Sequence, residues 1–339
     1  MKLTRSEHNP ILTPNPDQPW ESLVTTNPGA WFNESSGEVL LLYRAAGEDA
    51  AHKIHFGLAT SQDGVHFTRA SDQPVFSPSA DGFDAGCVED PRLIKMGDWY
   101  YVTYATRPFP PGQYWLEGDA KLYRPPQVPD EFPWMLRTNG TWTGLAVTKD
   151  FKDWMRLGRM TLPLDDNRDV ILFPEKINGK YWLLHRPSNR VGAEYGLELP
   201  AMWISSSTDL LDWDQGTVLA KGEYDWEGGK IGGNTPPIKT PLGWLTLYHA
   251  VGEDKQYRLG AMILDLDDPR NVRYRSRDWL LQPEMWYEKE GYYPGVVFPC
   301  GKVVIGGTLY VYYGGADKYV GLATCPLNDL LDYLRGCPV

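Results

Sequence analysis

The most regular pattern in the chain is a short run of apolar and aromatic residues that follows a glycine and recurs five times. The first copy, residues 37–44, reads Gly-Glu-Val-Leu-Leu-Leu-Tyr-Arg, and aliphatic and aromatic side chains after a turn residue are typical of a β-strand. The five copies are residues 37–44, 97–104, 179–186, 243–249 and 307–313. A second strand pattern follows each copy, at residues 56–63, 143–150, 202–209, 259–265 and 320–326.

These five pairs predict five structural units of about 60 residues each. A unit of several short strands that cannot bury both of its faces alone is typical of a β-propeller blade. The sequence therefore predicts an all-β fold, a five-bladed β-propeller, formed by residues 1–339 as a single catalytic domain. A pair of β-sandwiches is the alternative fold, and five equivalent units favour it less.

The second unit is longer than the others because it contains an insert at about residues 107–137, which is rich in proline and aromatic residues. A segment of this length in a compact fold is typical of a lid or a binding loop. A surface elaboration or an oligomer contact is an equally good interpretation, so a homo-oligomer is among the expected assemblies.

The charge and composition of the chain exclude some classes of binding partner. A net charge of -11 makes the polyanion of a nucleic acid an unsuitable partner, although it does not exclude a small anion bound locally. Residues 1–8 contain no apolar core of signal-peptide length, and no later run approaches a membrane span, so we expect no membrane partner and a cytoplasmic location. The cysteines lack paired metal spacing, and His52 and His55 are better interpreted as one strand's surface, so no metal and no cofactor are expected.

Candidate chemistry centres on residues 86–92, Gly-Cys-Val-Glu-Asp-Pro-Arg. The proline after Asp90 predicts an extended backbone at Asp90, which would present its carboxylate at the start of a strand. That position suits a catalytic acid. A buried ion pair between Asp90 and Arg92 is the alternative, because ion-pair networks resemble active sites.

In a propeller the inner strands begin near one central funnel, and the residues predicted there include a group of cations. Arginine matches a phosphate through two parallel hydrogen bonds, lysine adds a point charge and histidine can add one more bond. The group consists of Arg168, Arg186, Lys230 and His249. Ordinary glycosidases need two carboxylates, and Asp90 has no equally clear partner, so a small-anion site is indicated. Two observations oppose it: each cation can pair with an acid of its own blade, and Asp169 adjoins Arg168.

At these positions the chain resembles glycoside hydrolase family 130, which contains β-mannoside phosphorylases and some β-mannosidases. The resemblance is carried by residues 27–30, 43–44, 89–92, 168–180, 185–187, 230–233, 243–249 and 312–317. It implies a five-bladed propeller and an inverting mechanism in which Asp90 is the general acid, acting through the mannose 3-hydroxyl. Inorganic phosphate would attack the anomeric carbon of a manno-oligosaccharide, mannosyl-glucose or mannosyl-N-acetylglucosamine and give α-mannose 1-phosphate.

By the same resemblance Arg168, Arg186, Lys230 and His249 would hold the phosphate. The sugar in the cleaved subsite would be contacted by Asn27, Arg44 and Asp317. The implied partners are thus an oligosaccharide and inorganic phosphate as co-substrate.

Two other functions stay open. An inverting β-mannosidase would use water and a glutamate base, for which the candidates are Glu194, Glu198, Glu223 and Glu227. A non-catalytic glycan-binding propeller would use its aromatic insert to stack on sugar rings, because a propeller fold alone does not give function.

Overall fold

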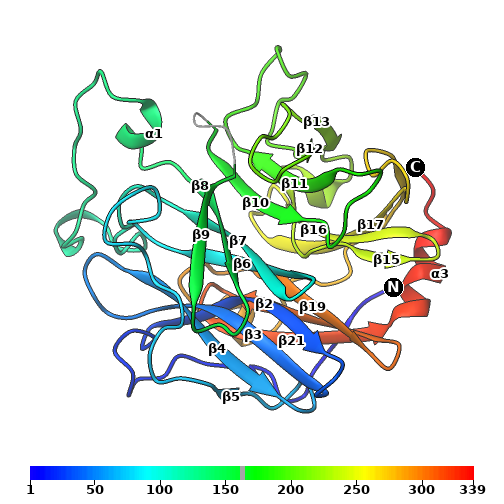
Figure 1. Ribbon diagram of the computed structural model, residues 1–339, viewed down its shortest axis with the longest axis horizontal. Helices are drawn as coiled ribbons and strands as arrows, with labels where there is room; N and C mark the ends of the chain where they lie inside the picture. Colours follow the sequence, from blue (N-terminus) through cyan, green and yellow to red (C-terminus); the bar gives the residue numbers. More distant parts are fainter. Residues whose placement is uncertain (161–164) are drawn as a thin grey trace.

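The computed structural model describes residues 1–160 and 165–339 of the chain, so residues 161–164 of the predicted domain lie outside the description. Five antiparallel sheets stand around a common centre (Figure 1). Blade one contains β2 (Val24–Asn33), β3 (Glu38–Ala46), β4 (Ile54–Ser61) and β5 (Thr68–Arg69). Blade two contains β6 (Glu89–Met96), β7 (Trp99–Thr106), β8 (Trp142–Thr148) and β9 (Trp154–Arg159).

The other three blades follow the same order with two variations. Blade three contains β10 (Asn167–Leu172), β11 (Tyr181–Pro187), β12 (Met202–Ser207) and β13 (Thr217–Ala220). Blade four contains β14 (Lys230–Gly233), β16 (Gly243–Val251), β17 (Tyr257–Leu264) and β18 (Val272–Arg275), and β15 (Ile238–Thr240) also pairs with β16. Blade five contains β19 (Val297–Ile305), β20 (Thr308–Gly315), β21 (Tyr319–Pro326) and, at its edge, β1 (Thr4–Arg5). The predicted five-bladed propeller is confirmed, and the two repeated patterns are the second and third strands of the blades.

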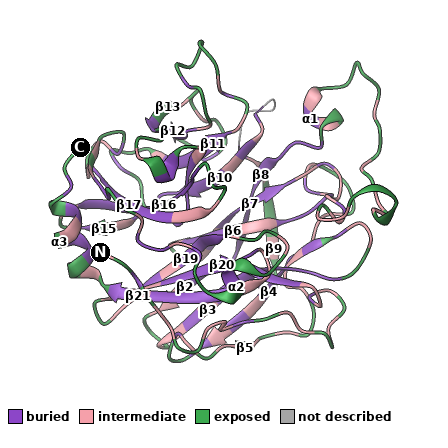
Figure 2. Ribbon diagram, turned by 180° about the vertical axis from the view of Figure 1, so that it is seen from behind, coloured by how far each residue is buried: buried purple, intermediate pink, exposed green. Residues whose placement is uncertain are grey.

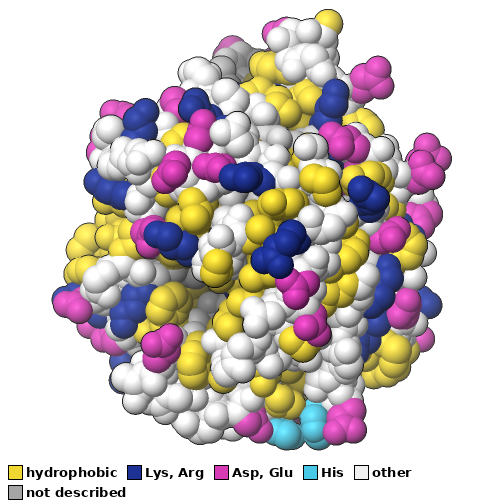
Figure 3. All heavy atoms as spheres, turned by 90° about the vertical axis from the view of Figure 1, so that its right-hand side faces the viewer, with side chains coloured by type: hydrophobic (Ala, Val, Ile, Leu, Met, Phe, Trp, Pro, Cys, Tyr) yellow, Lys and Arg dark blue, Asp and Glu magenta, His cyan; other side chains and the backbone are white. Residues whose placement is uncertain are grey.

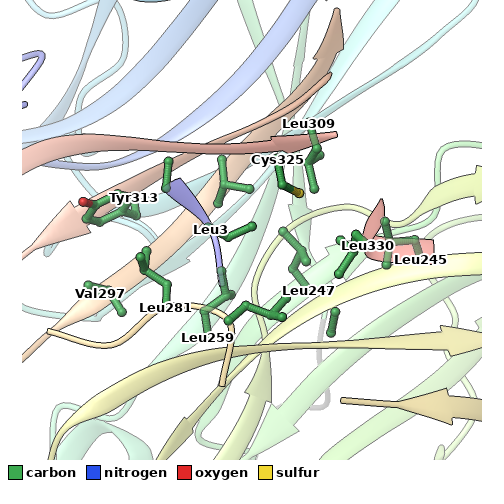
Figure 4. Packing of buried hydrophobic residues seen from close by; sticks show 14 of the residues in the cluster. Leu3, Leu245, Leu247, Leu259, Leu281, Val297, Leu309, Tyr313, Cys325 and Leu330 are labelled. Atoms are coloured by element: carbon green, nitrogen blue, oxygen red, sulfur yellow. The ribbon is translucent and has the colours of Figure 1, made fainter. Parts of the chain in front are cut away.

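The ring is closed by the N-terminal segment. Strand β1 pairs antiparallel with β21, with Thr4 opposite Thr324, and thereby completes the last blade. Leu3 packs in the core between blades four and five together with Leu330 of α3 (Leu327–Arg335), as Figure 4 shows. Both terminal segments thus pack in the same apolar cluster, which joins blade five to blade four.

A buried hydrogen-bonded triad recurs in four of the blades that the structure describes. In each, a tyrosine of the second strand lies over a glycine of the third strand, where a Cβ would meet the phenol ring at under 3 Å. The tyrosine hydroxyl donates to a buried carboxylate that also pairs with an arginine. The triads are Tyr43–Glu21–Arg69, Tyr104–Asp84–Arg156, Tyr248–Glu227–Arg275 and Tyr313–Glu288–Arg5. In blade three His185 takes the tyrosine's place opposite Trp203, and the ring bonds to Ser205 instead.

Figure 2 shows that the inner and second strands are largely buried, whereas much of the segment between β7 and β8 is exposed. That segment contains η1 (Gly118–Ala120) and α1 (Trp134–Arg137) and projects from the rim of the propeller (Figure 1). Two further short helices, η2 (Asp225–Glu227) and α2 (Trp286–Lys289), precede the inner strands of blades four and five. On the face drawn in Figure 3, basic and acidic side chains are interspersed. No helix within the described residues is long and apolar enough to cross a bilayer.

Candidate active site

The inner strands of blades one, two and three begin with the same local irregularity. In each, the pairing with the second strand shifts register at a β-bulge, and one polar residue inside the bulge has a left-handed backbone. These residues are Asn27 (φ 45°), Asp90 (φ 53°) and Asp169 (φ 55°). A bulge re-aims a side chain, and Asn and Asp tolerate positive φ better than most residues.

The prediction that Asp90 is extended is therefore wrong. The proline at position 91 favours an extended Asp90, but the β-bulge between Glu89 and Arg92 overrides that local preference and gives Asp90 a positive φ. The consequence is that Asp90 points toward the centre of the ring, alongside Asn27 of the neighbouring blade.

Asp90 is held through one of its two carboxylate oxygens. Asn27 Nδ2 donates a 2.7 Å hydrogen bond to Asp90 Oδ1, and Arg44 Nη1 lies 3.4 Å from the same oxygen. Within the described residues Oδ2 has no hydrogen-bond partner, and the side chain keeps 17 % exposure. Oδ2 is thus the oxygen that is free to meet a ligand.

The adjacent Glu89 has a different environment. Arg44 Nη1 lies 3.5 Å from one of its oxygens and Arg107 Nε lies 3.7 Å from the other. Burial alone would raise the pKa of Glu89, but these two guanidinium groups lower it to about 2. Glu89 therefore stays a carboxylate that partly offsets the charges of Arg44 and Arg107 beside Asp90.

A cavity of about 490 Å³ opens at this point and brings seven of the eight predicted site residues together. The seven are Asn27, Arg44, Asp90, Arg168, Arg186, Lys230 and Asp317. Seven lysine and arginine residues line the cavity against four aspartates and glutamates, although the whole chain carries a net charge of -11. The cavity therefore concentrates positive charge, as an anion site requires.

Three cations form the side of the cavity that blades three and four supply. Arg186 Nε lies 2.7 Å from Asp169 Oδ2, and Arg168 Nε lies 3.3 Å from Asp166 Oδ1. Lys230 Nζ donates to the Tyr257 hydroxyl at 2.5 Å. Burial, aided by Arg186, lowers the pKa of Lys230 to about 8, because the ammonium ion has no carboxylate partner of its own at contact distance within the described residues.

His249 is not among the described residues that line the cavity. It is fully buried behind Asp169, and burial holds its pKa at about 3 even though Asp169 acts to raise it. Burial thus favours the neutral ring, so His249 differs in its environment from the three cations with which the sequence grouped it. Its Nδ1 lies 2.9 Å from Asn234 Oδ1, and within the described residues its Nε2 has no hydrogen-bond partner.

The segment between β7 and β8 supplies another wall. Pro111, Tyr114, Lys121 and Pro125 line the cavity, and the Tyr114 hydroxyl lies 3.4 Å from Asp317 Oδ2. Burial, opposed by Arg44 and aided by Asp90, raises the pKa of Asp317.

Aromatic contacts of Trp115 attach the segment between β7 and β8 to the body of the propeller. The Trp115 ring lies 4.7 Å from the ring of His52 and 4.3 Å from that of Tyr292, measured between centroids. The segment is therefore anchored over blade one and the connection that leads to blade five, directly beside the cavity.

The four glutamates predicted as alternative bases lie elsewhere. Glu198, Glu223 and Glu227 line a separate hollow of about 900 Å³. Among the described residues, this hollow shares only Lys230 with the Asp90 cavity, and six acidic and three basic side chains line it. Glu227 is buried, and its two oxygens are occupied by Tyr248 and Arg275. Glu194 is exposed and lines neither space within the described residues.

Asp169 was not among the predicted site residues, yet it lines the cavity and contacts Arg186 and Arg92. An alignment of the five units would have found it, because Asp169 occupies the bulge position that Asn27 and Asp90 occupy in their blades. Tyr257 was also missed, and no local sequence signal distinguishes it from a structural tyrosine.

The fold and the site together define a five-bladed propeller that has an aspartate and several cations around one central cavity. A family model for glycoside hydrolase family 130, described as β-1,4-mannooligosaccharide phosphorylase, matches residues 2–110 and 136–336. The chain therefore belongs to this family, and residues 111–135 lie outside the match.

Individual relatives agree with the family. The chain is 37 % identical to a 1,2-β-oligomannan phosphorylase of Thermoanaerobacter sp. strain X514, over 97 % of this chain and 99 % of that protein. It is 30 % identical to a β-1,4-mannooligosaccharide phosphorylase of Ruminococcus albus, over 98 % of this chain and 91 % of that one. The structure of a β-1,2-mannobiose phosphorylase from Listeria innocua in complex with β-1,2-mannobiose superposes with a TM-score of 0.80 at 29 % identity, over 99 % of this chain and all of that one.

Proposed function

We propose that the protein is an inverting phosphorylase that cleaves a terminal β-mannoside with inorganic phosphate and releases α-mannose 1-phosphate. The observation that carries this proposal is the excess of positive charge in the Asp90 cavity of an otherwise acidic chain. A neutral sugar and water do not require that charge, whereas a phosphate dianion does.

Asp90 acts as the general acid in this proposal. Asn27 and Arg44 hold Oδ1, so the proton resides on Oδ2 and passes to the glycosidic oxygen, through the mannose 3-hydroxyl, as the bond to the leaving sugar breaks. A phosphate oxygen forms the new bond to the anomeric carbon from the opposite face. Asp90 is left as a carboxylate and regains its proton before the next turnover.

Phosphate is positioned by Arg168, Arg186 and Lys230 on the other side of the cavity, with His249 behind them. Because phosphate is already a nucleophile at neutral pH, the site needs no carboxylate base to activate it. Holding the anion against the anomeric carbon also converts a bimolecular attack into a positioned one. Asp317 and Arg44 lie where they can contact the sugar of the cleaved subsite.

Hydrolysis by a glutamate base is less well supported. An inverting hydrolase holds its two carboxyl groups about 6.5–9.5 Å apart across the sugar. The four candidate glutamates line the other hollow, or neither, and Glu227 is committed to Tyr248 and Arg275. A purely glycan-binding role leaves the group of cations without a purpose.

The first linkage to test is β-1,2, since the relatives at 37, 36 and 34 % identity are named for 1,2-β-oligomannan and β-1,2-mannobiose. The proposal assigns the acceptor sugar to the wall formed by Tyr114, Lys121 and Pro125. A cytoplasmic location is part of the proposal, because the charged sugar phosphate does not cross a membrane unaided.

The test incubates the protein with β-1,2-, β-1,3- and β-1,4-mannobiose, with and without inorganic phosphate, and assays mannose 1-phosphate and free mannose separately. We expect mannose 1-phosphate to form only when phosphate is present, fastest with one linkage. Free mannose released at a rate indifferent to phosphate would instead identify a hydrolase. Binding without either product would identify a glycan-binding protein.

A further inference from the structure

We propose that Asp169 makes the anion site selective for phosphate over tetrahedral dianions that carry no proton, because bound phosphate donates its proton to the Asp169 carboxylate. The inference rests on the proposed function, since it concerns the same anion. It also gives a role to Asp169, whose negative charge beside Arg168 would otherwise be an argument against a phosphate site.

Asp169 is built into the wall of the cavity. It is 4 % exposed, and its left-handed backbone in the β10 bulge aims it to the centre, as Asp90 is aimed in blade two. Arg186 Nε lies 2.7 Å from Oδ2 and Arg92 Nη2 lies 3.4 Å from Oδ1. The backbone of Gly232 packs so closely that a Cβ there would lie 2.6 Å from Oδ2. The carboxylate therefore has a fixed position.

An ionised carboxylate only accepts hydrogen bonds. Burial alone would raise the pKa of Asp169, but Arg186 and Arg92 hold it well below its usual range, so it stays charged at neutral pH. A sulfate ion next to this carboxylate places two groups together that only accept hydrogen bonds, with no proton to share between them. A phosphate ion at neutral pH keeps at least one proton and can turn that contact into a charge-assisted hydrogen bond.

A second hydrogen-bond acceptor, His249 Nε2, lies next to Asp169 Oδ2. Asn234 Nδ2 donates to the Pro299 carbonyl at 2.8 Å, which leaves Asn234 Oδ1 to accept the proton on His249 Nδ1. The neutral His249 ring then carries a lone pair on Nε2, which lies 3.8 Å from Asp169 Oδ2. Within the described residues His249 Nε2 has no donor and Asp169 Oδ2 accepts from Arg186 Nε alone, so the wall around Oδ2 offers a ligand acceptors and no histidine donor.

The first test needs no variant. Isothermal titration calorimetry of the intact protein at neutral pH compares phosphate and arsenate, which carry a proton, with sulfate and monofluorophosphate, which do not. We expect phosphate and arsenate to bind with similar affinity and both other anions to bind about 10- to 100-fold more weakly, the loss typical of an unpaired buried polar group. Sulfate binding within twofold of phosphate would overturn the inference.

The second test exchanges the acceptor. Asp169→Asn replaces one carboxylate oxygen by a donor, so we expect the phosphate-to-sulfate affinity ratio to collapse toward unity, chiefly through stronger sulfate binding. Asp166→Asn is the matched control: it lies three positions earlier, its carboxylate faces Arg168, and it does not line the cavity within the described residues. It should leave the ratio unchanged. An unchanged phosphate-to-sulfate affinity ratio in a folded Asp169→Asn variant would overturn the inference. If that variant does not fold, the comparison of the four anions with the wild-type protein decides the question.

The two proposals fail in different ways. If phosphate binds selectively but no mannose 1-phosphate forms, the proposed reaction is wrong and the selectivity stands. If mannose 1-phosphate forms but the protein binds sulfate with the same affinity as phosphate, the proposed reaction stands and the proposed role of Asp169 is wrong.

Discussion

Asn27 donates a hydrogen bond of 2.7 Å to Asp90 across the boundary between the first two blades, from one β-bulge to another. The two residues are 63 positions apart, and each occupies the left-handed position of its own bulge. Because the bond reaches only Oδ1, it fixes the orientation of the carboxyl group while Oδ2 stays available. The propeller thus supplies a positioned acid by repeating one backbone irregularity in adjacent blades.

Asp90→Asn tests the role of this acid. The amide keeps the shape of the side chain but has no acidic proton, so we expect turnover to fall by about 10²- to 10⁴-fold, the usual contribution of a general acid. Phosphate binding, measured by calorimetry, should change little. Asp98→Asn, at the exposed turn between β6 and β7, is the control and should keep full activity. Wild-type rates in Asp90→Asn would exclude Asp90 as the acid.

The alkaline limit of phosphate use should follow Lys230. Its pKa is lowered from 10.5 to about 8, so the free protein loses this positive charge as the pH rises through about 8, and kcat/KM for phosphate should fall there. Bound phosphate favours the charged form, so kcat at saturating phosphate should hold to higher pH. Lys230→Arg, which stays charged, should move the limit of kcat/KM upward.

Lys302 provides the control for this profile. Burial lowers its pKa to about 8 as well, but it does not line the cavity within the described residues. Lys302→Arg should therefore leave the alkaline limit where it is. A limit that moves with Lys302 and not with Lys230 would contradict the assignment.

Gly232 is the point where the phosphate wall is packed most tightly. An added Cβ would lie 2.6 Å from Asp169 Oδ2, 2.7 Å from His249 Cε1 and 2.9 Å from Arg186 Nε. Gly232→Ala should therefore displace these groups and raise KM for phosphate, with a smaller effect on KM for the mannoside. Gly228→Ala, whose Cβ would meet nothing closer than 3.4 Å, should behave as wild type. Equal effects of both variants would show that the packing at Gly232 is unimportant.

The blade triads should contribute to stability and not to catalysis. Tyr248→Phe leaves the fully buried Glu227 with one hydrogen-bond donor fewer, so we expect the free energy of unfolding to fall by about 1–3 kcal/mol while kcat is unchanged. Chemical denaturation measures the change. Tyr310→Phe is the control, because within the described residues the Tyr310 hydroxyl has no hydrogen-bond partner. A destabilisation equal to that of Tyr310→Phe would contradict the importance of the triad.

Most of the fold follows from periodicity. The second and third strands of each blade carry enough aromatic and β-branched residues to be recognised one by one, and their recurrence gives the blade number. The closing strand β1 was not predicted, because two residues cannot show a period and their pairing with β21 depends on the ring. The positive φ of Asp90 was missed for a related reason: a bulge depends on the partner strand, which a local rule for X-Pro pairs does not include.

The site follows from the sequence in part. Seven of the eight predicted residues share one cavity because they lie at the ends of inner and second strands, which the repeat had located. His249 lies one layer deeper, where burial favours its neutral ring although the neighbouring Asp169 acts to raise its pKa. Interactions between side chains of different blades set that charge, and no single segment of sequence contains them.

The most direct measurement follows ¹H and ³¹P NMR spectra of one sample that contains the protein, β-1,2-mannobiose and inorganic phosphate. We predict that signals of α-mannose 1-phosphate grow as inorganic phosphate disappears, with one phosphate consumed for each mannoside cleaved and with the α-configuration from the first spectrum onward. Release of free mannose while the inorganic phosphate signal stays constant would contradict the proposed function.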